Sequence, residues 1–259
     1  MDQKSIYHFN SGLVKVWQRN WLFFKKTWLV SLFWVVIEPV FYLGAIGFGL
    51  GAFVSNIQGM SYIEFFFPAL LCSTAMMVSF FEGTYGSYTK LTHIKTYSTI
   101  MLTPIGPNEI IFGEILWSAS KGFFGVLGVS LVAGFFGLLQ DANLLIALPV
   151  LFLIALSFAS FAMLMTSVAR NYDSFIYSTS GIIVPMSLLS GTYFPLEQLP
   201  TALKYVAYVF PLTHGVSAVR NIIAGNFSWV IGVNIFVLLV FILVFSSIAS
   251  RRIRLKLIR

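Results

Sequence analysis

Residues 190–220 read SGTYFPLEQLPTALKYVAYVFPLTHGVSAVR and lie between two long apolar runs of the chain. The stretch is too apolar for a solvent loop. It is also too interrupted for a membrane-spanning helix, because Pro195, Pro200 and Pro211 each lack a backbone donor and fix φ. In bilayer hydrocarbon, irregular backbone persists only where protein or a water-filled cavity shelters it. We therefore predict two short helices that break at Pro211 and form a gate or a cavity at the membrane edge.

The amino-acid composition indicates that the chain lies in a membrane. Of its 259 residues, 58% are hydrophobic and 10% are charged, whereas a soluble domain carries about 25% charged residues. This composition predicts one integral membrane domain, with membrane lipid around it. The formal net charge of +7 fits the excess of Lys and Arg in cytoplasmic loops better than it fits a nucleic-acid partner. The only cysteine, Cys72, lies in an apolar run and predicts neither a disulfide nor a metal site.

Residues 1–27 predict an amphipathic helix on the cytoplasmic membrane surface. At 100° per residue, aromatic side chains gather on one face and basic side chains on the other: Trp17, Trp21, Phe24 and Trp28 against Lys15, Arg19 and Lys26. Such a pattern is typical of a helix that lies in the headgroup region with its apolar face down. The alternative is an amphipathic helix that packs on a protein partner.

The predicted fold class is an all-α integral membrane protein with six transmembrane helices. Each apolar run is long enough, at about 1.5 Å per residue, to approach or exceed a hydrocarbon core of about 30 Å. The predicted spans are approximately residues 29–54, 62–88, 109–139, 144–169, 174–191 and 228–250. A re-entrant helical hairpin at residues 192–224 and a basic tail at residues 251–259 complete the single domain.

The basic residues predict the orientation of this domain. With a cytoplasmic N-terminus, 13 of the 16 Lys and Arg residues fall in cytoplasmic segments or the tail. Lys204 and Arg220 are then the only ones on the outer side, and Lys121 lies within a span. Since Lys and Arg concentrate in cytoplasmic loops, both termini are expected to be cytoplasmic. The hairpin at residues 192–224 is accordingly expected on the outer side.

Four ionisable residues lie inside the apolar runs: Glu38, Glu82, Glu114 and Lys121. A charge at a helix centre costs about 2.5–3.5 kcal/mol on insertion scales, so these side chains are expected to face the bundle interior and to find partners. Glu114 is about 10 Å from Lys121 along one helix, too far for a direct pair. We predict that Lys121 pairs with Glu38 or Glu82. The cluster either fixes helix packing or takes part in transport.

Small and polar residues mark two of the predicted spans. In the third span, Ser118 shares one face with Glu114 and Lys121, and several glycines there are expected to allow close packing of helices. The fifth span carries Ser180 and Ser187 among other small residues. A lipid-facing helix does not need such residues, so this span is expected to line a pathway or a subunit interface.

The chain lacks the signals of a catalytic or metal site. It has no G-x-x-x-x-G-K-[ST] phosphate loop, and its three histidines, His8, His93 and His214, are far apart in sequence. Glu109 and Glu114 form the one helically spaced carboxylate pair, and Glu109 is best explained by stabilisation at a helix N-terminus. We expect neither an enzyme nor a cofactor in this chain.

Short motifs in a fixed order resemble the permease subunits of type-2 ABC exporters. After the second span these are Leu102, Thr103, Pro104, Glu109, Ile110, Gly113 and Glu114. In the broken stretch they are residues 190–195, Leu199, Pro200 and residues 211–214, and a glycine-rich segment at residues 44–51 ends the first span. The chain is most similar to the permeases that export nodulation lipo-chitooligosaccharides and polysaccharides, and the likeness covers nearly its whole length.

The resemblance implies partners as well as a fold. Two copies of the permease form a homodimer in the bacterial inner membrane, and two separate cytoplasmic subunits bind ATP and Mg²⁺. These subunits dock on the N-terminal helix and on a coupling helix at about residues 92–102, which includes His93, Lys95, Thr96, Tyr97, Ser98, Ile100 and Met101. Where relatives commonly have glutamate, this chain has Ser98. The turn that contains Arg170 and Asp173 is the second, smaller contact.

On the outer side, the resemblance implies that the broken stretch caps the pathway. The gate residues are Tyr193, Phe194, Pro195, Pro200, Pro211, His214 and Arg220. For His214 and Arg220 a hydrogen bond or a headgroup contact is the preferred explanation over substrate binding.

The function expected from these features is ATP-driven export of a lipid-linked or amphipathic saccharide. A drug or lipid efflux permease of the same architecture is the alternative. An ion-coupled transporter that uses Lys121 with Glu38 or Glu82 as a proton relay is disfavoured, because the chain lacks two related halves. A membrane enzyme needs clustered acids or histidines at one membrane face, and this sequence has none.

Overall fold

A computed structural model describes residues 3–54, 56–57, 59–138 and 142–258. Within these residues the chain is helical and contains no β-strand beyond one isolated bridge, which confirms the all-α class. The long helices are α1 (Gln3–Tyr42), α2 (Tyr62–Phe81), α4 (Pro107–Phe135), α5 (Asn143–Val168) and α10 (Trp229–Ile258). The shorter ones are α3 (Thr96–Ile100), α6 (Ser174–Ser178), α7 (Val184–Leu189), α8 (Thr201–Val209) and α9 (Pro211–Ile223). Short π or 3₁₀ segments are η1 (Leu43–Gly49), η2 (Leu50–Ala52), η3 (Glu82–Gly86), η4 (Thr89–His93), η5 (Thr179–Ile183) and η6 (Leu196–Gln198).

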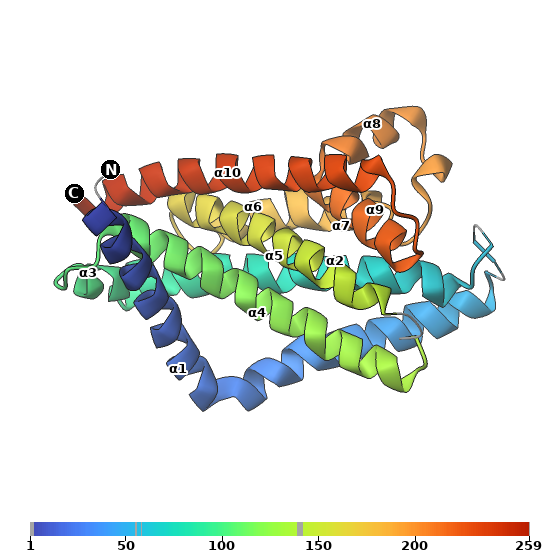
Figure 1. The fold of residues 1–259 in the computed structure, drawn as a ribbon, viewed down its shortest axis with the longest axis horizontal. Helices are drawn as coiled ribbons and strands as arrows, with labels where there is room; N and C mark the ends of the chain where they lie inside the picture. The colour runs from blue at the N-terminus through green and yellow to red at the C-terminus, as the bar shows by residue number, and fades with distance from the viewer. Residues whose placement is uncertain (1–2, 55, 58, 139–141, 259) are drawn as a thin grey trace.

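Four helices of the described chain are long and apolar enough to cross a membrane. They are Tyr62–His93, Pro107–Phe135, Asn143–Val168 and Trp229–Leu257, and they run lengthwise beside one another in Figure 1. These correspond to four of the six predicted spans. The count of six stays a prediction, because the runs at residues 29–54 and 174–191 are divided between shorter elements.

The fifth apolar run is shorter than expected. Its helical part, Ser174–Leu189, passes through α6, η5 and α7 and ends before the left-handed Gly191 (φ 77°). At about 1.5 Å per residue these 16 residues extend about 24 Å, less than the hydrocarbon thickness of about 30 Å. This element therefore needs a locally thinned bilayer or contact with other helices if it is to reach both membrane faces.

The N-terminal helix and the start of the first predicted span form one element. α1 continues from Gln3 to Tyr42 and changes direction part-way along its length (Figure 1). No Gly or Pro occurs between Leu13 and Glu38 to end the helix. Its aromatic face packs on α4, where Trp21 stacks near Phe124 at 5.7 Å. Protein contact thus accounts for part of the face that we expected to meet lipid headgroups.

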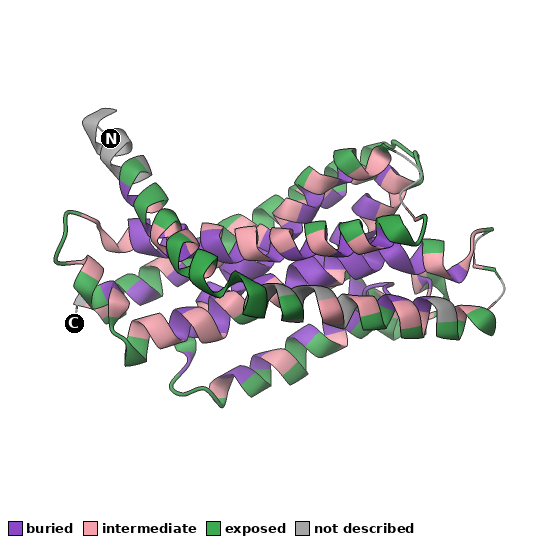
Figure 2. Ribbon diagram, turned by 90° about the horizontal axis from the view of Figure 1, so that it is seen from below, coloured by how far each residue is buried: buried purple, intermediate pink, exposed green. Residues whose placement is uncertain are grey.

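The core lies around α2. Among the most apolar residues of the helix Tyr62–His93, 72% are buried, whereas the corresponding fraction for the helix Trp229–Leu257 is 17%. Figure 2 shows the buried residues along the middle of the bundle and exposed residues along its outer helices. A helix that is apolar all round and mostly exposed is expected to face lipid or a second protein.

The broken stretch folds as two short helices at one end of the bundle. α8 and α9 meet at Phe210, which is extended, and Pro211 is the first residue of α9, so the predicted break at Pro211 is confirmed. α9 packs into the bundle, and α8 stands away from it (Figure 1). Both chain ends and α3 lie at the opposite end of the molecule (Figure 1). The hairpin and the termini are therefore separated along the bundle, as the charge distribution predicts.

Candidate functional site

A cluster of charges, with Glu114 buried and the others half-buried, joins η3 and η4 to α4 at the end of the bundle that carries the termini. Lys121 Nζ lies 2.8 Å from Glu82 Oε2, which confirms the predicted pairing and selects Glu82 of the two candidates. Trp117 Nε1 donates a hydrogen bond to Glu82 Oε1 at 2.9 Å. The side chain of Glu38 lies outside the described residues. Glu82 is thereby held by a cation and by a neutral donor from the same helix, α4.

Lys90 is the member of this cluster that sequence reasoning missed. Its Nζ lies 2.7 Å from Glu114 Oε2 and 3.7 Å from Glu82 Oε1, so one ammonium group links both carboxylates. Arg19 Nη1 of α1 approaches Glu114 Oε1 at 4.0 Å. The predicted second span ends at residue 88, which leaves Lys90 in the segment after it. The helical path through η3 and η4 instead brings Lys90 to the level of Glu82 and Glu114.

The inward face predicted for the third span is confirmed. Glu114 and Ser118 are fully buried, and Ser118 Oγ donates to the Glu114 carbonyl at 2.9 Å. A side chain at Gly122 would stand 2.0 Å from Ser79 Oγ and 2.9 Å from the Ala75 carbonyl oxygen, so only glycine allows this approach of α4 to α2. Glu109 accepts a hydrogen bond from the Gly106 N–H, the helix-start role expected for it.

The predicted coupling helix is shorter than the segment assigned to it. Helix α3 covers Thr96–Ile100 rather than residues 92–102. His93 is the last residue of η4, which ends the continuous helical segment Tyr62–His93. Lys95 adopts the left-handed conformation (φ 54°), which interrupts the helical path between η4 and α3. The segment is therefore a helix end, a tight turn and a single helical turn.

Tyr97 anchors α3 to the rest of the protein. Its side chain is fully buried and packs with Val16 of α1 and Ile110 of α4. Burial raises the pKa of its phenol well above the ordinary value, and the nearby Glu114 carboxylate adds to the rise. The short helix is thus connected both to α1 and to the charge cluster.

The exposed side chains of this segment agree only in part with those predicted to dock. Ile100 and Met101 are half-buried against the Tyr97 cluster, and Thr96 is also half-buried. Lys95 and Ser98 are exposed, as expected for contact residues. The apolar side chains open to a partner are Ile94 and Leu102, which are 67% and 88% exposed. A partner that docks on this loop therefore meets Ile94 and Leu102 before it meets Ile100 or Met101.

An aromatic cluster joins η4 to the turn at residues 170–173. The His93 ring stacks on Tyr172 with centroids 5.2 Å apart, and Tyr88 Oη donates to the Arg170 carbonyl at 2.7 Å. Thr89 Oγ1 lies 2.8 Å from Tyr172 Oη. Asp173 and Arg170 are exposed beside these groups. The two segments predicted to contact ATP-binding subunits are therefore adjacent and form one surface.

The serines of the fifth apolar run do not join the charge cluster. Ser180 is exposed on η5, and Ser187 is buried in α7. No hydrogen bond of the described residues links either one to Glu82, Glu114 or Lys121. The predicted intramembrane polar residues thus separate into a charged group between the α2 helix and α4 and two serines of the fifth run that lie apart from it.

The predicted gate residues hold the hairpin against the bundle. His214 places its two ring nitrogens 2.9 Å from Asn234 Oδ1 and 2.9 Å from the Tyr208 carbonyl oxygen. The Tyr193 carbonyl accepts a hydrogen bond from Tyr62 Oη at 3.0 Å. For His214 the hydrogen-bonding explanation is therefore confirmed.

The prolines of the hairpin occupy helix boundaries. Pro200 immediately precedes α8, and Pro211 is the first residue of α9, a position where proline costs no helical hydrogen bond. Pro195 is buried before η6, and Phe194 is half-buried beside it. These residues determine the path of the backbone rather than the chemistry of the hairpin.

Arg220 is the only Arg or Lys residue of α9, and its hydrogen bonds are with backbone carbonyls. Its Nη2 donates to the Phe65 carbonyl at 3.1 Å and to the Gly191 carbonyl at 3.0 Å. The guanidinium carbon lies 3.9 Å from the centroid of the Phe65 ring. The hydrogen-bonding explanation for Arg220 is confirmed, and Arg220 connects α9, α2 and the loop after α7.

Comparison with known proteins agrees with this arrangement. Residues 12–224 match the ABC-2 type transporter family. Nodulation protein J of Rhizobium meliloti is 37% identical over 213 residues, which cover 82% of this chain and 81% of that protein. Nodulation protein J of Rhizobium leguminosarum bv. viciae is 34% identical over 244 residues, 94% of each chain. The inner membrane transport permease YadH of Escherichia coli is 22% identical over 92% of each chain.

Proposed function

The chain belongs to the ABC-2 type transporter family, and from this premise we propose that it is the permease subunit of an ATP-driven exporter. Its substrate in this proposal is a lipid-linked or amphipathic oligosaccharide, which moves outward across the bacterial inner membrane. The resemblance to permeases that export nodulation lipo-chitooligosaccharides supports a saccharide substrate, and the likeness to proteins named nodulation protein J is consistent with that resemblance. Both termini are cytoplasmic in this proposal, consistent with the basic residues gathered near them.

The observation that carries the proposal is the surface that the segment from His93 to Leu102, which contains α3, forms with the turn at residues 170–173, where His93 stacks on Tyr172. Two cytoplasmic subunits that bind ATP and Mg²⁺ dock there, one on each copy of a permease homodimer. Their closure on ATP pushes on Ile94 and Leu102. Because η4 follows the α2 helix and Tyr97 packs on α1 and α4, the push reaches three helices together. The permease has two alternative arrangements of its helices, and the ATP-binding subunits shift the equilibrium between them.

In this proposal the apolar surfaces that one chain leaves open face either the second copy or membrane lipid. α10 is apolar and mostly exposed, and Tyr177 on the fifth run is 82% exposed. In the proposed homodimer the fifth run faces the pathway or the second copy, and α10 faces lipid. Substrate enters from the cytoplasm or inner leaflet and leaves beneath the hairpin of α8 and α9.

The test replaces the exposed apolar side chains of the coupling surface. We expect the double variant Ile94→Asp, Leu102→Asp to fold normally, because both side chains are exposed, and to lose most ATP-dependent export. The matched control is Ile94→Met, Leu102→Met, which keeps an apolar surface and retains export. The measurement is transport of a labelled glycolipid into inverted vesicles that contain the permease and its ATP-binding subunits. Unchanged export by the Asp variant would rule out this surface as the coupling site.

A drug or lipid efflux permease of the same architecture is the alternative function. Ion-coupled transport is a weaker one, because Lys121 and Glu82 are already paired and Lys90 bridges Glu82 to Glu114. Export measured with ATP present and the proton gradient collapsed distinguishes ATP hydrolysis from the proton gradient as the energy source. We expect export to persist under that condition and to stop when ATP is withdrawn.

A further inference from the structure

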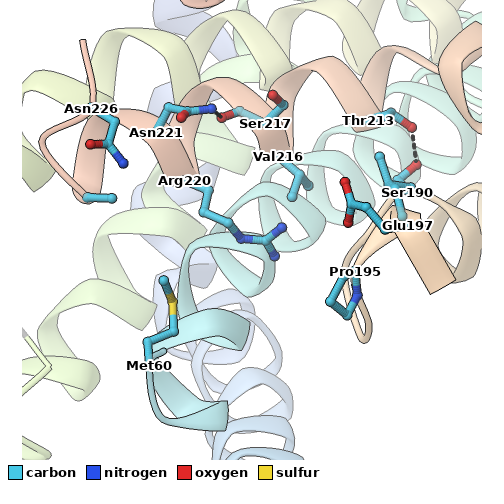
Figure 3. Close-up of a pocket in the computed structure, with 12 residues that line it drawn as sticks. Met60, Ser190, Pro195, Glu197, Thr213, Val216, Ser217, Arg220, Asn221 and Asn226 are labelled. Atoms are coloured by element: carbon cyan, nitrogen blue, oxygen red, sulfur yellow. Dashed lines mark hydrogen bonds between the residues drawn. The ribbon is translucent and has the colours of Figure 1, made fainter. Parts of the chain in front are cut away.

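The outer end of the bundle contains a pocket that none of the features above explains. Its volume is about 230 Å³, and it lies between α9, the loop before η6 and the residue Met60 that precedes α2 (Figure 3). Its lining combines apolar side chains with several polar ones, namely Arg220, Ser217 and Asn221 from α9, with Glu197 and Asn226 beside them. A partly polar hollow in an apolar protein is the kind of site that orients a ligand with a few placed hydrogen bonds.

Arg220 keeps unused donors at this pocket. Its two carbonyl acceptors are both bound by Nη2, whereas a guanidinium has five N–H donors. Nε has no hydrogen-bond partner among the described residues, and none of their carboxylates lies within 4.0 Å of the group. Figure 3 shows the guanidinium extending from α9 toward the side of the pocket that carries Glu197 and Pro195. The carbonyls and the Phe65 ring therefore hold Arg220 in place without neutralising it.

The neighbouring polar groups add both donors and acceptors. Ser217 Oγ accepts a hydrogen bond from Asn234 Nδ2 at 3.1 Å, which leaves its own hydrogen to donate. Asn221 Nδ2 donates to the Ser217 carbonyl at 2.8 Å, which leaves its amide oxygen to accept. Glu197 is exposed and forms no hydrogen bond or ion pair with the described residues. The lining thus carries one cation, one anion and several neutral groups.

This mixture selects among ligand classes. A phosphate or carboxylate would gain from Arg220 but would meet the Glu197 carboxylate in the same pocket, and like charges at close range repel. A purely apolar ligand would displace water from Arg220 and Glu197 without offering hydrogen bonds in its place, which is unfavourable. A neutral ligand with several hydroxyl groups can accept from Arg220 and donate to Glu197. The apolar parts of Val216, Pro195 and Leu196 in the lining suit the C–H faces of a ring.

We propose that this pocket binds one neutral sugar unit on the outer side of the membrane. Its volume is below the range of about 300–1,000 Å³ for pockets that hold drug-sized ligands, which fits a single pyranose better than a longer chain. The inference rests on the proposed export of a saccharide and names the place where one unit of it pauses. A bound sugar bridges α9 to the loop before η6 and so steadies the hairpin while substrate leaves.

The test measures sugar binding by the full chain in lipid nanodiscs. The probes are methyl β-glucoside and N-acetylglucosamine, with inorganic phosphate as the anionic comparison, and saturation-transfer NMR detects millimolar affinity. We expect both sugars to bind and phosphate not to bind. Glu197→Ala is expected to weaken sugar binding at least fivefold, and Gln198→Ala, its exposed neighbour, to leave it unchanged.

Several outcomes would overturn this site. They are absence of sugar binding, binding of phosphate in preference to sugar, or equal affinity in the wild type and Glu197→Ala. Because Arg220 also holds three segments together, Arg220→Lys is used only with a measured free energy of unfolding beside it. ATP-dependent glycolipid export that persists without monosaccharide binding would refute the pocket and keep the proposed function. Monosaccharide binding by a chain that exports no saccharide would keep the pocket and refute the proposed function.

Discussion

Two half-buried cationic sites, one at each end of the bundle, are stabilised in different ways. At the end near the termini, Lys90 and Lys121 face the carboxylates of Glu82 and Glu114. At the hairpin end, Arg220 is held by two carbonyls and an aromatic ring. Charge in apolar surroundings needs a partner in either case. Carboxylates neutralise the first site and make it a rigid connection, whereas carbonyls leave the second site charged and able to bind a further group.

The largest expected effect is on the carboxylate-paired site. Glu82→Gln leaves Lys121 without its counterion, and removal of one partner from a buried pair costs on the order of 3–5 kcal/mol. Lys121→Met alone leaves Glu82 with Lys90, 3.7 Å away, as its remaining cation. We expect the double variant Glu82→Gln, Lys121→Met to lose less stability than the two single losses combined. The measurement is the free energy of unfolding in mixed detergent micelles.

The matched control for this cycle is Glu197→Gln, an exposed carboxylate that is expected to change stability by no more than about 0.5 kcal/mol. Strict additivity of the two single variants would show that the pair contributes nothing specific. A charge exchange is a poorer test, because a lysine at position 82 would face Lys90, whose Nζ now lies 3.7 Å from Glu82. Rescue by the exchange is therefore not expected.

A smaller effect is expected at the carbonyl-held site. Arg220→Gln removes the charge-assisted hydrogen bonds to Phe65 and Gly191, and such bonds contribute about 1.5–3 kcal/mol. The same unfolding measurement should place this loss below that of Glu82→Gln. A loss as large as that of Glu82→Gln would mean that the two sites do not differ in the way we describe.

Glycines at the two ends provide a third comparison. A side chain at Gly113 would stand 2.7 Å from Val16 Cβ and 3.0 Å from the Leu13 carbonyl oxygen, both close to rigid backbone. At Gly215 the obstacle is the end of the Ile154 side chain, 2.7 Å away, which can rotate. We expect Gly113→Ala to cost about 1–3 kcal/mol by overpacking, and Gly215→Ala to cost less. Unfolding of both variants checks the order.

Gly181→Ala is the control for these two variants. An added Cβ there meets no atom within 4 Å, and alanine favours a helix over glycine by about 1 kcal/mol. We expect no loss of stability at this position. A loss equal to that of Gly113→Ala would show that glycine flexibility, rather than close packing, is what matters.

The smallest effect is expected at the start of α2. Ser61 Oγ accepts from the Glu64 N–H, and the Glu64 carboxylate accepts from the Ser61 N–H at 2.9 Å, which is a reciprocal helix cap. Ser61→Ala removes half of it and is expected to cost about 0.5–2 kcal/mol. Ser61→Asp, which keeps an acceptor, is the control. Equal losses for both variants would contradict a capping role.

Most of the fold class could be predicted from the sequence, and less of the candidate site. Lys121 could be given a short set of partners because a charge inside an apolar run must be paired. The partners of Lys90 could not be predicted in this way. The π-helical segments η3 and η4 change which residues lie on the same face of the helix. The exposure of individual side chains in the predicted coupling segment could not be predicted either. The left-handed Lys95 exposes Ile94, and the Tyr97 cluster covers much of Ile100 and Met101.

The sequence by itself determined the membrane class, the apolar helices and the break at Pro211. These follow from composition and from residues that act on their own backbone. Only the tertiary structure decided which charges meet, that the turn at residues 170–173 lies against His93, and that Arg220 opens onto a pocket. Such contacts depend on how α2, α4 and α9 pack, and packing joins residues that are remote in sequence.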